Sequence, residues 1–330
     1  MALFELVGDL ASIRRLAWAL RPIIHYGSAS HQLRFHAVRI TTAHARGDLE
    51  ELVDASRAQS EVPGADTLGM QLQAALDRVL CSSFRGDLDE ALDRSSELLA
   101  SARSCRPWLE TRLRTNRLIH LMLAGRWEEA ARESAGALRG ARGDLLAVGL
   151  AEACDIDLAR FLGRLDEARF RVERLGPHQR FRTLVQLPLL RAQAGDLSGA
   201  LEQHVAGHRP SAPPYALALA GFLHAELLAA SGRVADAREV LAPAIDVLFP
   251  LHRGDALQLD AALVDGPTPP VPGTTWRGRM WWAWGLARRG HRDAESVIAD
   301  LHTTVAGLPE VSEPAWRWSL AQNALRSARS

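Results

Sequence analysis

The stretch Arg85-Gly86-Asp87-Leu88-Asp89-Glu90-Ala91 decides the fold, because versions of it recur along most of the chain. A glycine opens each copy, an apolar residue follows two positions later, and the residue five positions on is usually alanine. Self-similarity at a nearly fixed period is typical of solenoids, in which one structural unit is stacked many times. The glycines are Gly47, Gly86, Gly125, Gly163, Gly195 and Gly232, at spacings of 39, 39, 38, 32 and 37 residues, with a looser seventh copy at Gly290.

Each copy has the features of a tight turn between two helices. The glycine suits the left-handed conformation just past the end of a first helix, where a Cβ would clash. Asp48, Asp87 and Asp196 then suit the N-cap of a second helix, and Glu51 stands three residues after Asp48, as in a capping box. The small residue five positions after the glycine is expected where the two helices approach most closely, because a larger side chain would overpack the contact.

These turns resemble those of the tetratricopeptide repeat (TPR). The resemblance rests on GDLDEA from Gly86, GRWEEA from Gly125 and GRLDEA from Gly163, within residues 30–250 and again in 275–305. The period is nearer 39 than the 34 residues usual for that repeat. Longer repeats of this kind are similar to the sensor arm of large ATP-binding bacterial regulators, the maltose-regulon activator and its LuxR-type relatives. The resemblance implies an all-α, right-handed α-solenoid of about seven TPR-like hairpins with capping helices at both ends.

This expectation divides the chain into four parts. Residues 1–29 are expected to form an N-terminal capping helix, although Arg14, Arg15 and Arg21 leave open a helix on a membrane surface. Residues 30–250 hold the TPR-like repeats. The prolines of 251–275 predict an irregular insertion, and residues 276–330 are expected to form a tryptophan-rich C-terminal repeat and cap.

The tryptophans of the C-terminal part allow two interpretations. They could pack a cap over the open end of the solenoid, or they could line a pocket for an aromatic or apolar ligand. Packing is favoured, because terminal repeats are usually atypical. Six of the nine tryptophans of the chain lie in this C-terminal part: Trp276, Trp281, Trp282, Trp284, Trp316 and Trp318.

Composition limits the class of protein. The 39 basic residues balance the 39 acidic ones, and all of the basic ones are arginine, so nothing suggests nucleic acid as a direct partner. Cys81, Cys105 and Cys154 are few and odd in number, which fits a reducing cytoplasm. No apolar run is long enough to span a membrane. We therefore expect a cytoplasmic protein without a membrane partner, while its oligomeric state stays open.

Several kinds of chemistry lack the residues they need. Without lysine there is no Walker phosphate-binding loop and no Schiff base, and the glycine-rich and zinc motifs of common enzymes are missing too. His204 and His208 share a helix face but have no third metal ligand nearby. Asp155 and Asp157 diverge on their helix and are expected to form a charge network with Arg160. The sequence thus names no catalytic residue, no metal site and no cofactor.

The resemblance instead implies a binding site in the concave groove, which is lined by the first helices. Arg34, Arg112 and Arg277 occupy the same place in their repeats, as does Arg182. Such arginines suit carboxylates or phosphates by bidentate pairing, although they could equally serve only to solvate a polar groove. The groove-facing candidates are Arg34, Thr41, His44, Gln73, Arg112, Asn116, Asp157, Arg160, Arg182, Gln186, Glu226, Arg277, Trp281 and Trp284.

Two functional hypotheses follow. The leading one is a TPR-like module that binds a protein segment, a peptide or a small effector and acts as a regulatory or scaffold protein. Membership of the ATP-binding activators would imply a role in transcriptional regulation. The alternative is a helical-repeat enzyme or auxiliary protein of specialised metabolism, with its pocket at Trp276–Trp284 and Trp316–Trp318.

Overall fold

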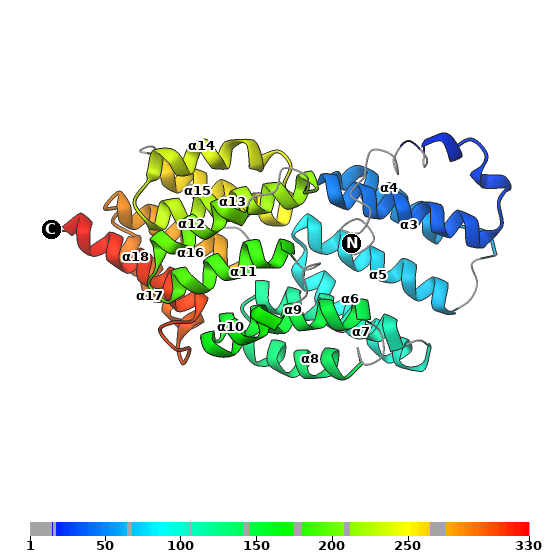
Figure 1. The fold of residues 1–330 in the computed structure, drawn as a ribbon, viewed down its shortest axis with the longest axis horizontal. Helices are drawn as coiled ribbons and strands as arrows, with labels where there is room; N and C mark the ends of the chain where they lie inside the picture. The colour runs from blue at the N-terminus through cyan, green and yellow to red at the C-terminus, as the bar shows by residue number, and fades with distance from the viewer. Residues whose placement is uncertain are drawn as a thin grey trace.

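The computed structural model describes residues 15, 18–64, 68–105, 107–140, 145–174, 180–207, 212–264 and 275–329. Within these ranges the chain is all-α, with no strand (Figure 1). None of the described helices is long and apolar enough to cross a lipid bilayer. A 3-10 helix, η1 (Ile24–Tyr26), precedes α3 (Ala29–Arg46), α4 (Leu49–Ser60), α5 (Leu68–Arg85), α6 (Leu88–Cys105), α7 (Pro107–Leu123), α8 (Trp127–Gly140), α9 (Leu145–Phe161), α10 (Leu165–Arg174), α11 (Arg180–Gln193), α12 (Leu197–Gly207), α13 (Pro214–Ala230), α14 (Val234–Ile245), α15 (Pro250–Leu263), α16 (Trp276–Arg288), α17 (Ala294–Val305) and α18 (Glu313–Arg329).

Helices pair into hairpins at each predicted glycine turn. The first helices α3, α5, α7, α9, α11, α13 and α16 each pack on the second helix that follows them. All seven turn glycines have a φ between 61° and 101°, the left-handed region that a side chain disfavours. Asp48 caps α4 by accepting a hydrogen bond from the amide of Glu51 at 3.1 Å, and Asp196 caps α12 through Gly199 at 2.8 Å. The predicted turns and these two N-caps are confirmed.

The small residue that follows each turn lies in the contact between the two helices of its hairpin. Its side chain is fully buried in every copy that has alanine five positions after the glycine. A larger side chain would have to push the helices apart, so the packing explains the pattern. These residues are Ala91, Ala130, Ala168, Ala200 and Ala237, each 0% exposed, with Leu52 at 2% in the first copy.

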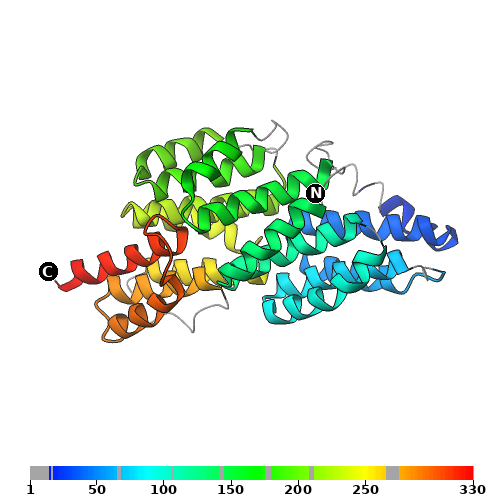
Figure 2. The ribbon, with the colours of Figure 1, turned by 90° about the horizontal axis from the view of Figure 1, so that it is seen from below.

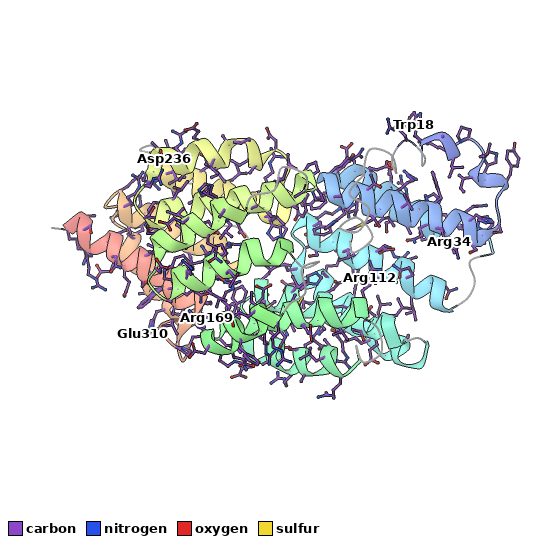
Figure 3. All side chains as sticks on the ribbon, in the orientation of Figure 1. Trp18, Arg34, Arg112, Arg169, Asp236 and Glu310 are labelled. Carbon is purple, nitrogen blue, oxygen red and sulfur yellow. The ribbon has the colours of Figure 1, made fainter. Side chains whose placement is uncertain are left out.

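The two ends of the repeat region depart from the expected boundaries. The expected capping helix of residues 1–29 lies largely outside the described residues; in its described part, Trp18 is 69% exposed (Figure 3) and Ser28 caps α3. Residues 251–263, expected to be irregular, belong to α15, so that expectation is corrected. Pro250 starts α15 at its first turn, where the missing N–H is not needed. The prolines of 267–272 lie outside the described residues.

The array curves so that its early and late hairpins meet. Helix α13 contacts α3, α15 contacts α5, and α18 contacts α9. Even so, α3 and the end of α18 lie at opposite ends of the molecule (Figure 2). The turn at Gly47 rests against Val247, since an added Cβ would lie 1.9 Å from the Val247 carbonyl oxygen. One hydrophobic core therefore joins the early hairpins to the late ones, since it includes both Ala43 of α3 and Ala321 of α18.

Candidate functional site

Aromatic side chains fill the inner side of the array where α3, α5, α13 and α15 meet. Phe84 stacks on Phe249 with ring centroids 4.4 Å apart, and Tyr215 lies 4.6 Å from Phe249. The ring of His44 contacts all three. Burial lowers the pKa of His44 to about 4, and the charge of Arg112 acts in the same direction. The imidazole is therefore neutral at pH 7 and packs as part of the core.

A buried carboxylate, Glu226 of α13, gathers several of the charged candidates. It accepts hydrogen bonds from Arg277 Nε at 2.8 Å and from Trp281 Nε1 at 2.6 Å. Arg317 of α18 donates to it from Nη1 at 2.8 Å. Burial alone would raise the pKa of Glu226, but Arg277 and Arg317 lower it below its usual value. Glu226 is therefore ionised at neutral pH.

The ion pairs continue from Arg317 to α9. Arg317 donates to Glu313 Oε1 at 2.9 Å, and Glu313 also pairs with Arg160. Arg160 in turn donates to Asp157 Oδ1 at 3.1 Å. Acidic and basic groups alternate, so their charges cancel. We call these six residues the Glu226 network: Asp157, Arg160, Glu226, Arg277, Glu313 and Arg317.

The Glu226 network joins helices and leaves little surface for a ligand. Arg160, Glu313 and Arg317 have side chains that are 4%, 2% and 1% exposed. Burial lowers the pKa of Arg160 to about 10, against the opposing charge of Asp157, so Arg160 remains a cation at pH 7. A buried ion pair adds little stability by itself, but removal of one partner leaves an uncompensated charge. The network is therefore suited to fixing how α9, α13, α16 and α18 meet.

Sequence reasoning named four members of this network and missed Glu313 and Arg317. These two stand four residues apart on α18, which is the spacing of an ion pair on one helix face. That spacing could have drawn attention to them. Their contact with Glu226 and Arg160 depends on the curvature of the whole array, which no local pattern shows.

Three of the four tryptophans of α16 are part of the core. Trp276, Trp281 and Trp284 are 1%, 2% and 7% exposed. Trp276 Nε1 donates to the Met122 carbonyl oxygen at 2.9 Å, and its ring lies edge-on to Trp127 with centroids 5.7 Å apart. Trp284 lies edge-on to Trp281 at 5.5 Å. Of the two interpretations, the contacts of these residues match packing.

Arg112, the charged candidate on α7, is less enclosed than the core of the Glu226 network. Arg112 of α7 has a side chain that is 39% exposed (Figure 3), and its Nη2 lies 3.7 Å from Oδ1 of Asp77 on α5, too far for a hydrogen bond. Asp77 is 3% exposed, and its Oδ2 accepts a hydrogen bond from Gln73 at 3.0 Å. Asn116 follows Arg112 by one helical turn and is 8% exposed. We call Gln73, Asp77, Arg112 and Asn116 the Arg112 site.

Two buried polar atoms of the Arg112 site lack a hydrogen-bond partner among the described residues: Oδ1 of Asp77 and Nδ2 of Asn116. Burial raises the pKa of Asp77, although Arg112, Gln73 and Gln59 act in the opposite direction. The site thus offers a partly exposed guanidinium, an amide donor and a carboxyl group held behind them. Such a group of donors can receive an anion.

Other candidates are spread more widely. Arg34 is exposed on α3 (Figure 3), and Thr41 donates to the carbonyl oxygen of its own helix at Ala37. Arg182 and Gln186 belong to α11, but their side chains lie outside the described part of the chain.

The acidic pair and one residue of the histidine pair lie in the described part of the chain. Asp157 pairs with Arg160 as expected, whereas Asp155 pairs with Arg171. His204 is buried, and His208 lies outside the described residues. Among the residues that the structure describes, no three His, Cys, Asp or Glu side chains are placed to hold a metal ion.

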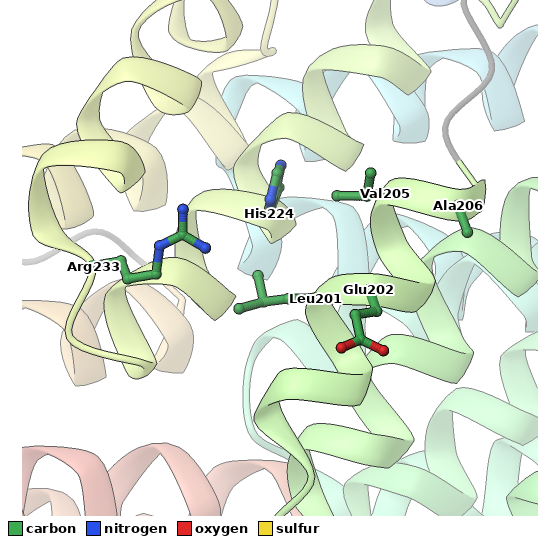
Figure 4. A pocket seen from close by; sticks show the side chains of 6 residues that line it. All are labelled: Leu201, Glu202, Val205, Ala206, His224 and Arg233. Atoms are coloured by element: carbon green, nitrogen blue, oxygen red, sulfur yellow. The ribbon is translucent and has the colours of Figure 1, made fainter.

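A shallow hollow of about 420 Å³ lies between α12 and α13 (Figure 4). Leu201 and Val205 give it an apolar side, and Val205 is 60% exposed. Glu202 and Arg233 also line it, but the guanidinium of Arg233 donates to Asp236 at 2.6 Å. The hollow has too few convergent polar groups to define a ligand.

Comparison with known proteins gives no family for the chain. No family model matches it, and no curated protein matches it.

Proposed function

We propose that the chain is a TPR-like binding module, a right-handed α-solenoid of about seven hairpins that receives an acidic protein segment or effector on its inner face. The recurring turn supports the repeat assignment, because all seven turn glycines are left-handed and the alanines that follow them are buried. The Arg112 site supports the choice of an acidic ligand and of the early hairpins.

The observation that carries the proposal is the contrast between Arg112 and Arg277. They stand equally far before their turn glycines, Gly125 and Gly290. Arg277 is 19% exposed and donates two hydrogen bonds to Glu226, whereas Arg112 is 39% exposed and, among the described residues, has a longer contact with Asp77 as its ion pair. A guanidinium carries five donors in a planar fork that matches a carboxylate. Arg112 therefore retains donors that a ligand can use.

A module of this kind acts as a regulatory or scaffold protein. The sparse cysteines support a cytoplasmic location, and the balanced charge gives no basis for direct contact with nucleic acid. The resemblance to the sensor arm of LuxR-type activators would connect ligand binding to transcription. The alternative, an enzyme or auxiliary protein with a tryptophan-lined pocket, gains no support from Trp276, Trp281 and Trp284, because they pack in the core.

The proposal is tested by measuring the binding of fluorescein-labelled acetyl-hexaglutamate with fluorescence anisotropy. Arg112→Ala should weaken binding about tenfold or more, because a hydrogen bond to a charged group contributes roughly 1.5–3 kcal/mol. Arg132→Ala is the matched control, since Arg132 is exposed on the second helix α8, away from the inner face. Arg132→Ala should melt close to the parent because its side chain is exposed, and Arg112→Ala should lose little because the buried Asp77 can take up a proton when its cation is removed.

Labelled acetyl-hexaglutamine, which has the same length without the charges, should not bind. Equal loss of affinity in the two arginine variants would mean that overall charge, not the Arg112 site, attracts the peptide. Failure of the parent to bind hexaglutamate would remove the proposal.

A further inference from the structure

The Arg112 site pairs an exposed cation with an enclosed carboxyl group that it does not fully satisfy. The distance between Arg112 Nη2 and Asp77 Oδ1 is 3.7 Å, and that oxygen accepts no hydrogen bond from the described residues. Arg112 is 39% exposed while Asp77 is 3% exposed, so solvent and ligands reach the guanidinium before they reach the carboxyl. Any anion that binds Arg112 must therefore share this cation with Asp77.

Among the described residues, Arg112 is the charged group that acts on Asp77. Helix α5, which carries Asp77 itself, contributes the amide of Gln73 and the thiol of Cys81 to its surroundings. Helix α4 contributes the amide of Gln59. Burial raises the pKa of the Cys81 thiol to about 11, so it is neutral at pH 7. The titratable groups of α15, His252 and Asp255, interact with Arg277 and Glu226 instead.

We propose that the Arg112 site binds a carboxylate of the ligand and a proton together, with Arg112 and Asn116 as donors to the carboxylate and Asp77 as the group that accepts the proton. This inference rests on the proposed function, since it specifies the chemistry of the same site. One negative charge and one proton from solvent enter, so the net charge of the site does not change. A protonated Asp77 can donate a hydrogen bond to the ligand, which an ionised Asp77 cannot do.

The physical reason is the repulsion between two carboxylates that share one cation. Like charges within a few ångströms in a poorly hydrated site cannot both stay ionised, so one of them takes up a proton. The enclosed group is Asp77, whose pKa burial already raises, whereas the ligand carboxylate retains contact with water. The unpartnered Nδ2 of Asn116 supplies a second donor to the anion without adding charge.

The experiment measures the dissociation constant of labelled acetyl-hexaglutamate between about pH 6.5 and 8.5 at constant ionic strength. The carboxyl groups of the peptide titrate near 4.3 and keep their charge over this range, and for this series the fluorescein is replaced by a label that does not titrate there. Affinity for the parent should fall as the pH rises, by up to about tenfold per pH unit wherever Asp77 is ionised in the free protein and protonated in the complex. Asp77→Asn cannot titrate, so its affinity should stay nearly constant and should match or exceed that of the parent at every pH.

Calorimetry of the parent in two buffers of different ionisation enthalpy gives the proton uptake directly and does not depend on how well the variant folds. An uptake approaching one proton, lost in Asp77→Asn, is the expected result. Binding that depends on Arg112 but is independent of pH, with no proton uptake, would overturn this inference and leave the proposed function intact. Absence of binding, or binding indifferent to Arg112, would remove both.

Discussion

Replacing Glu226 by glutamine should destabilise the protein more than most single polar substitutions. The substitution keeps the shape of the side chain but removes a negative charge that Arg277, Arg317 and Trp281 all contact. Glu226 is 0% exposed, so water cannot replace it. The substitution therefore leaves Arg317, which is buried, and Arg277, which is partly buried, without the carboxylate that they share.

The magnitude follows from what each arginine retains. Removal of one partner from a buried ion pair costs about 3–5 kcal/mol. Arg317 keeps its bond to Glu313, and Arg277 can reach water through its 19% exposed side chain, so we expect the lower end, about 3 kcal/mol. At roughly 2–3 °C per kcal/mol for a chain of this size, the melting temperature should fall by about 6–9 °C.

Thermal melts followed by circular dichroism at neutral pH measure this effect. Glu295→Gln is the matched control, because Glu295 is 69% exposed and its pair with Arg329 lies at the surface, where such pairs contribute under about 1 kcal/mol. Adding Arg277→Met to Glu226→Gln should restore part of the loss, because it removes one uncompensated charge. A Glu226→Gln protein that melts with the parent would refute the view that the network joins the helices.

Three further predictions concern other parts of the core. Gly47→Ala should lower the free energy of unfolding by well over the roughly 1–2 kcal/mol of left-handed strain, because its Cβ would lie 1.9 Å from the Val247 carbonyl oxygen. A Cβ at Gly232 would have nothing within 4 Å, so Gly232→Ala should cost only the strain, and urea titrations of the two variants measure the difference. Burial raises the pKa of Asp255 from 3.8 to about 7, so the folded protein keeps a proton that the unfolded chain loses, and stability contributed by this group falls as pH rises between these values. Asp255→Asn should therefore be more stable than the parent at pH 8 by a few kcal/mol and close to it at pH 4, in melts at both pH values. Cys81 should resist a thiol reagent in the native protein and react in urea, because it is 6% exposed and burial raises its pKa to about 11; labelling of Cys81 in the native state would contradict its placement.

The hairpins could be predicted from the sequence because their determinants are local. Gly86 and Ala91 act within one turn and the helix that follows, so the spacing alone indicates a left-handed residue and a close helix contact. Pro250 shows the limit of this reasoning. A proline can mark a break in the repeat, but it is equally compatible with the first turn of a helix. Here the segment that begins at Pro250 forms helix α15, which packs against α14 and α16.

The candidate site could be predicted only in part, for a similar reason. Arg160, Glu226 and Arg277, three of the candidates found by counting back from the turns, do belong to one network of ion pairs. It does not find their partners Glu313 and Arg317, because these come from α18, which reaches the network through the curvature of the array. Asp77 was missed because a buried aspartate one turn after Gln73 has no distinctive spacing.

The curvature also explains why similar inner positions have different roles. Where α9, α13, α16 and α18 face one another, an inward arginine such as Arg277 finds a carboxylate of its own chain and is satisfied by it. On α7, the ion-pair partner of Arg112 among the described residues is Asp77, at a distance that excludes a hydrogen bond, and the side chain of Arg112 is partly in solvent. A cation that its own chain does not satisfy can contribute its remaining donors to a ligand, whereas one that is already paired must first give up its bonds. Arg112, which keeps donors that no described residue engages, is therefore a place at which we expect a ligand to bind.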